Sequence, residues 1–196
     1  MKCKYCNQPS GFLKSYHSEC HNHIKTRESE ISTLIEQLHI DIKSVQSVKL
    51  RLKEIASEDN LYINHMKNSN FNSEHVQENE NIIYCENWIT ITESKNRPKM
   101  VRTGYRYEKK PVWKVANYKL GDNLTILFTD KSLYLISDQI SLRYTYNKIL
   151  NINCDERWTY TYFDVKTTSP YPHRFYIKSN NRINKNVYLL IKCFTS

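Results

Sequence analysis

The sequence predicts an α+β protein in three parts: a small cysteine-rich head, a helical arm, and an antiparallel β-barrel capped by a C-terminal helix. Three observations predict this order. Cysteines and histidines cluster at the N-terminus, apolar residues with a helical period follow, and after residue 87 the period changes to the alternation of β-strands. With 196 residues, 39% of them hydrophobic and 25% charged, the chain has the length of one to one and a half ordinary domains.

The composition excludes several common classes of protein. The chain contains three glycines, Gly11, Gly104 and Gly121, whereas phosphate-binding loops and dinucleotide-binding turns need clustered glycines. No apolar run approaches the ~18 residues of a membrane-spanning helix. The N-terminus has no apolar core of a secretory signal. We therefore expect a cytoplasmic protein, for which a basic surface would allow peripheral attachment to the inner membrane.

The head carries four residues with the spacing of a metal site. Cys3 and Cys6 are separated by two residues, and after ten more residues His17 and Cys20 form a second closely spaced pair. Four nitrogen and sulfur donors in two such pairs can close a tetrahedron around Zn²⁺. Because all four positions would be taken by the protein, the predicted zinc site is structural rather than catalytic.

Two alternatives remain at this site. His21 or His23 could supply the nitrogen in place of His17, although both follow Cys20 closely. The cysteines could also be free thiols, but a small head with little apolar sequence needs another source of stability. Disulfides are not expected in a chain without a secretory signal, which favours a metal. Cys85, Cys154 and Cys193 lie among apolar residues and are predicted to be buried small side chains.

The arm has the apolar spacing of a helix. Residues spaced seven apart are Ile24, Ile31, Leu38, Val45 and Leu52, with no glycine or proline between residues 12 and 97. A break is expected at residues 39–42, where Asp41 could cap a second helix. A broken helix that packs on its own chain is favoured over a coiled coil, which would imply self-association. A short helix and a linker are expected in the polar segment 57–81.

The last part alternates like an antiparallel sheet. Residues 124–128 and 133–136 flank the polar turn at 129–132, which predicts a β-hairpin. Further strands are expected at residues 141–146, 149–153, 159–166 and 174–178. The apolar residues from Ile183 to Phe194 return to helical spacing, with Asn181 or Asn184 available as an N-cap. A C-terminal helix over one end of a barrel is the architecture that this pattern indicates.

Charge is distributed unevenly along the chain. Residues 1–86 carry 10 Lys and Arg against 12 Asp and Glu, whereas residues 87–196 carry 19 against 8. Seven of the sixteen residues from Lys95 to Lys110 are basic, the densest positive stretch in the chain. Because Pro98 and Pro111 interrupt regular structure, this stretch is predicted to contain a mobile loop. The predicted partner-binding residues are Arg102, Arg106, Lys109 and Lys110.

Two stretches resemble known families. With Gly11-Phe12-Leu13 between the two pairs, Cys3, Cys6, His17 and Cys20 resemble the zinc-ribbon or zinc-finger heads at the start of many bacterial and phage proteins. About residues 100–195 resemble the bacterial pleckstrin-homology-like (PH-like) domain. The second resemblance rests on Arg102-Thr103-Gly104-Tyr105, Gly121-Asp122-Asn123-Leu124-Thr125-Ile126, Thr129-Asp130-Lys131-Ser132-Leu133-Tyr134 and Tyr146-Asn147-Lys148-Ile149-Leu150.

The resemblances imply a fold and a class of function. The PH-like family implies two nearly orthogonal antiparallel sheets of about seven strands, capped by one C-terminal helix, in a non-enzymatic scaffold that binds proteins, peptides or phospholipid headgroups. The expected domains are a zinc finger at 1–23, a helical arm and linker at 24–86, and a PH-like β-barrel at 87–196. No ligand-binding residue is carried over from either family.

We therefore expect a non-catalytic adaptor or interaction protein whose basic domain binds a protein partner or an anionic membrane surface. The alternative is a nucleic-acid-binding protein that uses the finger and the basic barrel together. The alternating tyrosines Tyr144, Tyr146, Tyr160 and Tyr162 would suit base stacking, although such residues more often form one face of a barrel. An enzyme is not expected, because the acid–x–lysine triplets at Glu93 and Asp164 are common by chance.

Overall fold

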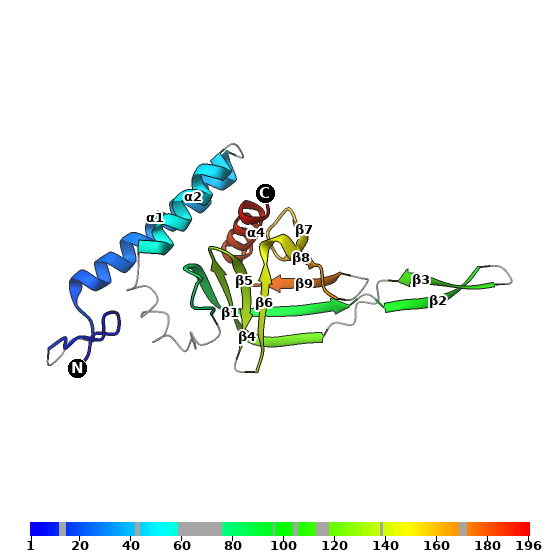
Figure 1. The fold of residues 1–196 in the computed structure, drawn as a ribbon, viewed down its shortest axis with the longest axis horizontal. Helices are drawn as coiled ribbons and strands as arrows, with labels where there is room; N and C mark the ends of the chain where they lie inside the picture. Colours follow the sequence, from blue (N-terminus) through cyan, green and yellow to red (C-terminus); the bar gives the residue numbers. More distant parts are fainter. Residues whose placement is uncertain are drawn as a thin grey trace. The chain divides into compact units, whose positions relative to one another are not determined.

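The computed structural model describes most of the chain as helices and strands (Figure 1). The described residues are 1–11, 15–41, 44–58, 76–95, 97–103, 106–112, 118–137, 139–168 and 172–196. The helices are α1 (Ser18–Ile40), α2 (Val45–Glu58), the 3₁₀ turn η3 (Tyr146–Lys148) and α4 (Asn181–Thr195). The strands are β1 (Ile82–Lys95), β2 (Arg97–Thr103), β3 (Arg106–Val112), β4 (Tyr118–Thr129), β5 (Ser132–Ile136), β6 (Ser141–Thr145), β7 (Ile149–Cys154), β8 (Thr161–Val165) and β9 (His173–Lys178).

The helical arm is broken where the sequence predicts a break. α1 ends at Ile40, and Asp41 is its C-cap residue, with its backbone N–H bonded to the carbonyl of Gln37; we had expected Asp41 to cap the second helix. α1 and α2 then pack against each other (Figure 1). Arg51 of α2 donates from Nε to Glu30 of α1 over 2.8 Å. The prediction of a helix pair that packs on its own chain is confirmed. The short helix expected near residues 57–81 falls largely outside the described residues.

Seven strands form one antiparallel sheet in the order β6-β5-β4-β1-β9-β8-β7, and β2 and β3 form a separate two-stranded ribbon. The predicted β-barrel is therefore wrong, because the sheet is not closed. The turn between the two end strands, β6 and β7, contacts the C-terminal helix. Tyr146 of η3 is buried and stacks on Phe194 of α4, with ring centroids 4.8 Å apart. The C-terminal helix thus covers apolar surface where barrel closure was expected.

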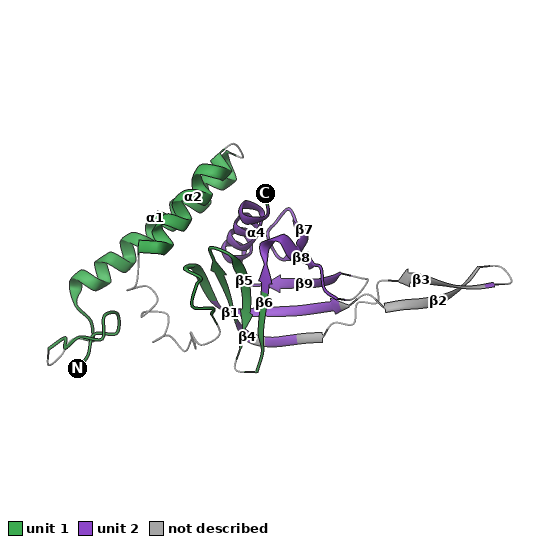
Figure 2. Cartoon of the chain, in the orientation of Figure 1, with its two compact units in different colours: residues 1–86, 125–143, 196 green, residues 87–124, 144–195 purple. Residues whose placement is uncertain are grey.

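The chain divides into two compact units (Figure 2). Unit 1 comprises residues 1–86, 125–143 and 196, and unit 2 comprises residues 87–124 and 144–195. The predicted hairpin of residues 124–136 is confirmed in unit 1, where β4 pairs with β5 in a register that places Ile126 opposite Leu135. None of the described helices is long and apolar enough to cross a membrane.

The core of unit 2 lies between α4 and the strands β7 and β8. Val187, Leu190 and Ile191 of α4 are fully buried. Beneath them, the rings of Phe163 and Phe175 stack at 5.4 Å. The predicted C-terminal helix is confirmed, but its predicted caps are wrong. The side-chain oxygen of Asn180 accepts the backbone N–H of Ile183 over 2.9 Å, as an N-cap residue does.

Asn184, one of the expected caps, is instead a buried link between α4 and the sheet. Its side-chain amide donates to the carbonyls of Trp158 and Ser179, over 2.8 and 3.1 Å. The backbone carbonyl of Asn184 accepts a hydrogen bond from the hydroxyl of Thr161 over 2.9 Å. Thr161 therefore points toward α4, which fixes the orientation of β8.

Unit 1 contains a buried ion pair that the sequence did not predict. The carboxylate of Glu80 is fully buried and accepts the Nε–H of Arg143 over 2.9 Å. It also accepts the hydroxyls of Thr129 and Ser132, over 2.5 and 3.2 Å. Burial alone would raise the pKa of Glu80, but these hydrogen bonds and the charge of Arg143 outweigh it and lower the pKa.

Glu80→Gln is expected to destabilise unit 1 by about 3 kcal/mol, because it leaves the guanidinium of Arg143 without its buried charge partner. The folded-state pKa of Glu80 is lowered, so its contribution is present above the pKa of the unfolded chain and is lost as pH falls through the folded value. Urea denaturation at several pH values would measure both effects. Glu78→Gln, at an exposed neighbouring position, is the control. Equal stability of the two variants at neutral pH would contradict this role for Glu80.

Candidate metal centre

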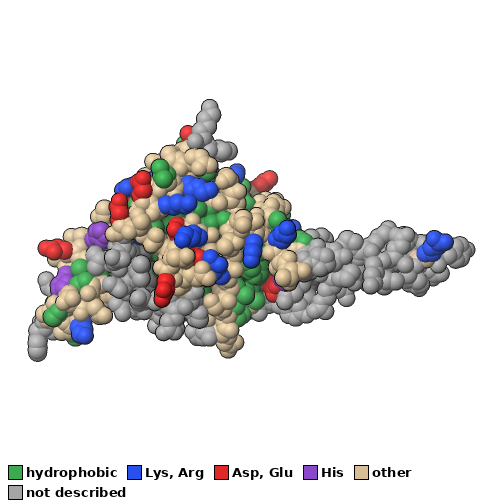
Figure 3. Space-filling model, viewed as in Figure 1, with side chains coloured by type: hydrophobic (Ala, Val, Ile, Leu, Met, Phe, Trp, Pro, Cys, Tyr) green, Lys and Arg blue, Asp and Glu red, His purple; other side chains and the backbone are tan. Residues whose placement is uncertain are grey.

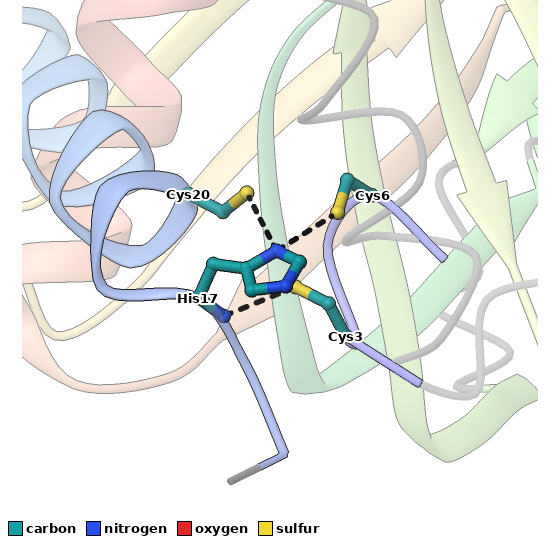
Figure 4. Close-up of side chains that lie close together, drawn as sticks. All are labelled: Cys3, Cys6, His17 and Cys20. Atoms are coloured by element: carbon teal, nitrogen blue, oxygen red, sulfur yellow. Dashed lines mark hydrogen bonds between the residues drawn. The ribbon is translucent and has the colours of Figure 1, made fainter. Parts of the chain in front are cut away.

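Four side chains of the head converge on one point (Figure 4). Cys3 and Cys6 come from the N-terminal loop, His17 is the N-cap residue of α1, and Cys20 lies in its first turn. The potential ligand atoms of these four residues all lie within 4.8 Å of one another. They are close enough to bind a metal ion, and among the described residues they form the one such Cys, His, Asp or Glu cluster.

The distances suit a tetrahedral ion. Nδ1 of His17 lies 3.3 Å from Sγ of Cys6 and 3.9 Å from Sγ of Cys20. In a tetrahedral site with zinc–sulfur bonds of ~2.3 Å, neighbouring ligand atoms are separated by roughly 3.5–3.8 Å. These two distances lie close to the tetrahedral values, and the four ligand atoms, all within 4.8 Å of one another, need to draw together by about 1 Å or less to share one ion.

The backbone of the loop explains how two cysteines three positions apart reach one point. The N–H of Cys3 donates to the carbonyl of Gln8 over 2.8 Å, and the N–H of Asn7 donates to the carbonyl of Cys3 over 2.9 Å. The turn closes because Asn7 adopts a φ of 63°, a left-handed conformation that asparagine tolerates better than most residues. A neighbouring pairing of Lys2 with Pro9 holds the two arms of the loop together.

The electrostatics of the thiols favour a bound cation. Burial alone would raise the pKa of Cys3, but backbone N–H groups of Cys6, His17 and Tyr5 outweigh it and lower the pKa to about 6. The N–H of His17 lies 3.3 Å from this sulfur. Burial, together with the neighbouring thiols of Cys6 and Cys3, raises the pKa of Cys20 to about 11. Because adjacent thiolates repel one another, a positive ion is what would allow all three to ionise.

The imidazole of His17 is oriented for metal binding. Its Nε2 lies 2.9 Å from the carbonyl oxygen of Pro9. A carbonyl only accepts hydrogen bonds, so Nε2 carries the proton and the lone pair of Nδ1 faces the sulfurs. Metal-binding histidines commonly donate their second N–H to a carbonyl in this way. Of the rival ligands, His21 is engaged elsewhere: its Nδ1 lies 2.9 Å from the hydroxyl of Tyr5.

The metal centre is embedded in the core of unit 1. A buried cluster of this unit contains Cys3, Tyr5, Ile24, Ile82, Leu127, Tyr134 and Ile136. Cys6 and Cys20 pack against the same cluster, as does Cys85. The ligands are thus continuous with the packing of α1, β1, β4 and β5. Of the other cysteines, Cys193 is buried as predicted, whereas Cys85 and Cys154 are partly exposed.

The predicted partner-binding residues lie on the β2–β3 ribbon. Arg106 is exposed, and the side chains of Arg102, Lys109 and Lys110 fall outside what the structure describes. In the register of the ribbon, Met100 is opposite Lys109 and Lys99 is opposite Lys110. Figure 3 shows further Lys and Arg side chains, in blue, among the described residues on the face of the molecule turned toward the viewer.

Residues 97–103 and 106–112 of the basic stretch form regular strands, and the residues between them, where the predicted mobile loop would lie, fall outside the described residues. Pro98 lies directly opposite Pro111. In an antiparallel pair, alternate opposed residues exchange no hydrogen bonds and point their N–H positions outward. Two prolines can share such a position without breaking the ribbon, since neither is required to donate.

The two acid–x–lysine triplets do not form a common site. Oε1 of Glu93 lies 2.7 Å from Nδ1 of His173, and Asp164 accepts two hydrogen bonds from Arg174, over 2.6 and 2.9 Å.

Sequence reasoning missed another charged residue in the core, Arg27. It occupies a position in the apolar stripe of α1 and donates to the carbonyls of Ile82 and Ile83. Its position in that apolar stripe is the feature of the sequence from which its burial could have been predicted.

No family model matches this chain, and no curated protein matches it.

Proposed function

We propose that this chain is a non-catalytic, zinc-binding interaction protein whose basic unit binds an anionic membrane surface through the β2–β3 ribbon. The observation that carries the proposal is the concentration of charge. Unit 2 has 17 Lys and Arg against 6 Asp and Glu, a net of +11, whereas unit 1 has a net of −2. Polybasic segments bind anionic lipid with about 1 kcal/mol for each Lys or Arg near the surface.

The donor set supports zinc as the ion. Three cysteine sulfurs and one imidazole nitrogen are soft and borderline ligands, which select zinc over magnesium or calcium. Four protein donors leave no open position for a substrate or a catalytic water, so the proposed role is structural. We assign no catalytic role to the other charged residues.

A PH-like assignment for the sheet is part of the proposal. The resemblance implies about seven antiparallel strands in two sheets, followed by one C-terminal helix. The number of strands and the position of α4 after them support the assignment, whereas the strands form one open sheet. The β2–β3 ribbon is inserted between β1 and β4, two neighbouring strands of the sheet. A short ribbon attached to a rigid sheet is a suitable element for contacting a flat surface.

Replacing Arg106, Lys109 and Lys110 with Glu is expected to weaken binding to vesicles of phosphatidylcholine and phosphatidylserine by about 100-fold or more. The melting temperature should remain nearly unchanged, because Arg106 is exposed. Vesicle sedimentation in about 0.15 M salt would measure the binding.

The matched control reverses three exposed lysines of unit 1, Lys2, Lys25 and Lys53. It makes the same change in net charge and should lose much less affinity. Equal losses in the two variants would show that net charge, and not the ribbon, governs binding. Absence of vesicle binding by the unaltered protein would overturn the membrane proposal and leave a protein partner as the alternative.

A further inference from the structure

One face of unit 2 carries three tyrosines: Tyr162 on β8, Tyr176 on β9 and Tyr160 directly before β8. Thr161 points toward α4, to which it is hydrogen-bonded, and successive residues of a strand point to opposite sides. Tyr160 and Tyr162 therefore point away from α4. The register places Tyr176 opposite Tyr162 on the neighbouring strand β9, so it shares their side of the sheet.

The tyrosine rings form one continuous group. The centroid of Tyr176 lies 5.5 Å from that of Tyr162 and 6.5 Å from that of Tyr160. Tyr160 is 41% exposed, and the other two rings are partly exposed. Core tyrosines such as Tyr134, at 1% exposure, are packed very differently. The group therefore presents aromatic surface to solvent.

The positively charged side chain of Arg174 lies over one ring of the group. The guanidinium of Arg174 lies 4.2 Å from the centroid of the Tyr162 ring. Its Nε and Nη2 donate to the two carboxylate oxygens of Asp164, over 2.6 and 2.9 Å. A guanidinium fixed by two hydrogen bonds offers a planar, positive surface on which a base can stack. Asp164 is itself buried, so its negative charge is directed at Arg174 rather than at solvent.

The flanking positions on this face are polar or basic. In the strand register, Asn153 lies beside Tyr162 and Thr92 beside Tyr176. Lys178 is exposed and lies next to Thr90. Two acidic groups near the tyrosines are engaged in hydrogen bonds: Asp164 accepts from Arg174, and the carboxylate of Asp155 accepts the backbone N–H of Tyr160 and the hydroxyl of Thr159. The tyrosine face, defined as Tyr160, Tyr162, Tyr176, Arg174 and Lys178, thus combines aromatic rings with cations.

We propose that the tyrosine face is a docking surface for single-stranded nucleic acid. Its rings and the guanidinium would stack unpaired bases, and the exposed Lys178 would attract a phosphate. The combination of partly exposed rings with the cations Arg174 and Lys178 favours an anionic ligand with stacking bases, and the lack of aliphatic side chains at the face positions named above argues against an apolar protein interface. This surface is separate in its residues from the β2–β3 ribbon and from the metal ligands.

The test measures the binding of a fluorescein-labelled oligothymidylate of about 15 nucleotides to the full, zinc-loaded chain by fluorescence anisotropy. Tyr160→Ala and Tyr176→Ala should each weaken binding about tenfold, because each removes a stacking ring. Tyr160→Phe and Tyr176→Phe should bind nearly as well as the unaltered protein, because they keep the ring. Lys178→Ala should reduce the dependence of log K on log salt by about 0.7.

Tyr16→Ala is the control, since Tyr16 is a tyrosine of similar exposure in unit 1 and should leave the affinity unchanged. A duplex of the same length should compete poorly, because its bases are already stacked. Failure to bind the oligonucleotide, full binding by Tyr160→Ala, or equal binding of the duplex would each overturn the proposal. Vesicle binding by Tyr160→Ala should be unchanged, which separates this result from the test of the β2–β3 ribbon.

Discussion

Cys20→Ser should remove the metal and unfold unit 1. The unaltered protein is expected to contain about one equivalent of zinc, and a serine hydroxyl cannot replace the thiolate of Cys20 at neutral pH. Structural zinc contributes roughly 10–16 kcal/mol of apparent binding free energy in small fingers, which is as large as the whole stability of a typical domain. Elemental analysis and thermal unfolding would measure the two effects.

Cys154→Ser is the matched control, because Cys154 is a partly exposed cysteine of unit 2 outside the cluster. It should keep both the metal and the melting temperature. Retention of stoichiometric zinc by Cys20→Ser would show that this thiol is not a ligand. Protein purified without chelator that contains no metal would contradict the site altogether.

The position of the metal centre also predicts which strands lose stability when the metal is removed. Cys3 and Tyr5 share a buried cluster with Leu127 of β4 and Tyr134 of β5. Removing the metal with a chelator should therefore increase amide hydrogen exchange in β5 as well as in the head. The β8–β9 pair belongs to unit 2 and should retain its protection. Loss of protection confined to residues 1–20 would show that the head folds independently.

Leu190→Asp should cost about 4 kcal/mol or more of the stability of unit 2. Leu190 is fully buried in α4, which packs against β7 and β8. The substitution removes an apolar side chain from the core and places a carboxylate there without a charge partner. Chemical denaturation would measure the loss, and part of it should be recovered at acidic pH, where the new carboxyl group is neutral.

Asn181→Asp is the control for this substitution. Asn181 is the exposed first residue of the same helix, where an added negative charge is favourable. Its stability should equal or slightly exceed that of the unaltered protein. If Leu190→Asp were as stable as this control, α4 would not be part of the core of unit 2.

Elements with local signals were predictable from the sequence. The break in the arm was predicted at residues 39–42 from Asp41, a residue type that caps helices, and the hairpin of β4 and β5 follows from two apolar runs around one polar turn. The four candidate ligands could be predicted because two short spacings determine which side chains can meet. His17 was favoured over His21 and His23 because those two follow Cys20 too closely, and the structure agrees: His17 joins the cluster, with its Nε2 2.9 Å from the carbonyl of Pro9.

Features that depend on distant partners were not predictable. β1 includes the buried Glu93, whose carboxylate is satisfied by His173 far along the chain. Glu80 is likewise a buried acid with a distant partner, because Arg143, which donates to it, lies on β6. The β2–β3 ribbon was missed for another reason. Proline alone argues against a strand, and only the pairing of Pro98 with Pro111 removes the objection.

Unit 1 is built from segments far apart in the sequence, and this affects how it forms while the chain is synthesised on the ribosome. The metal ligands are all made once Cys20 has been added, but Leu127, the next cluster member after Ile82, follows about a hundred residues later. At about 5–20 residues per second, that interval is roughly 5–20 seconds. During this time the nascent head has its complete ligand set and lacks much of the apolar surface on which it finally packs. Metal capture can therefore precede the folding of the core that surrounds it.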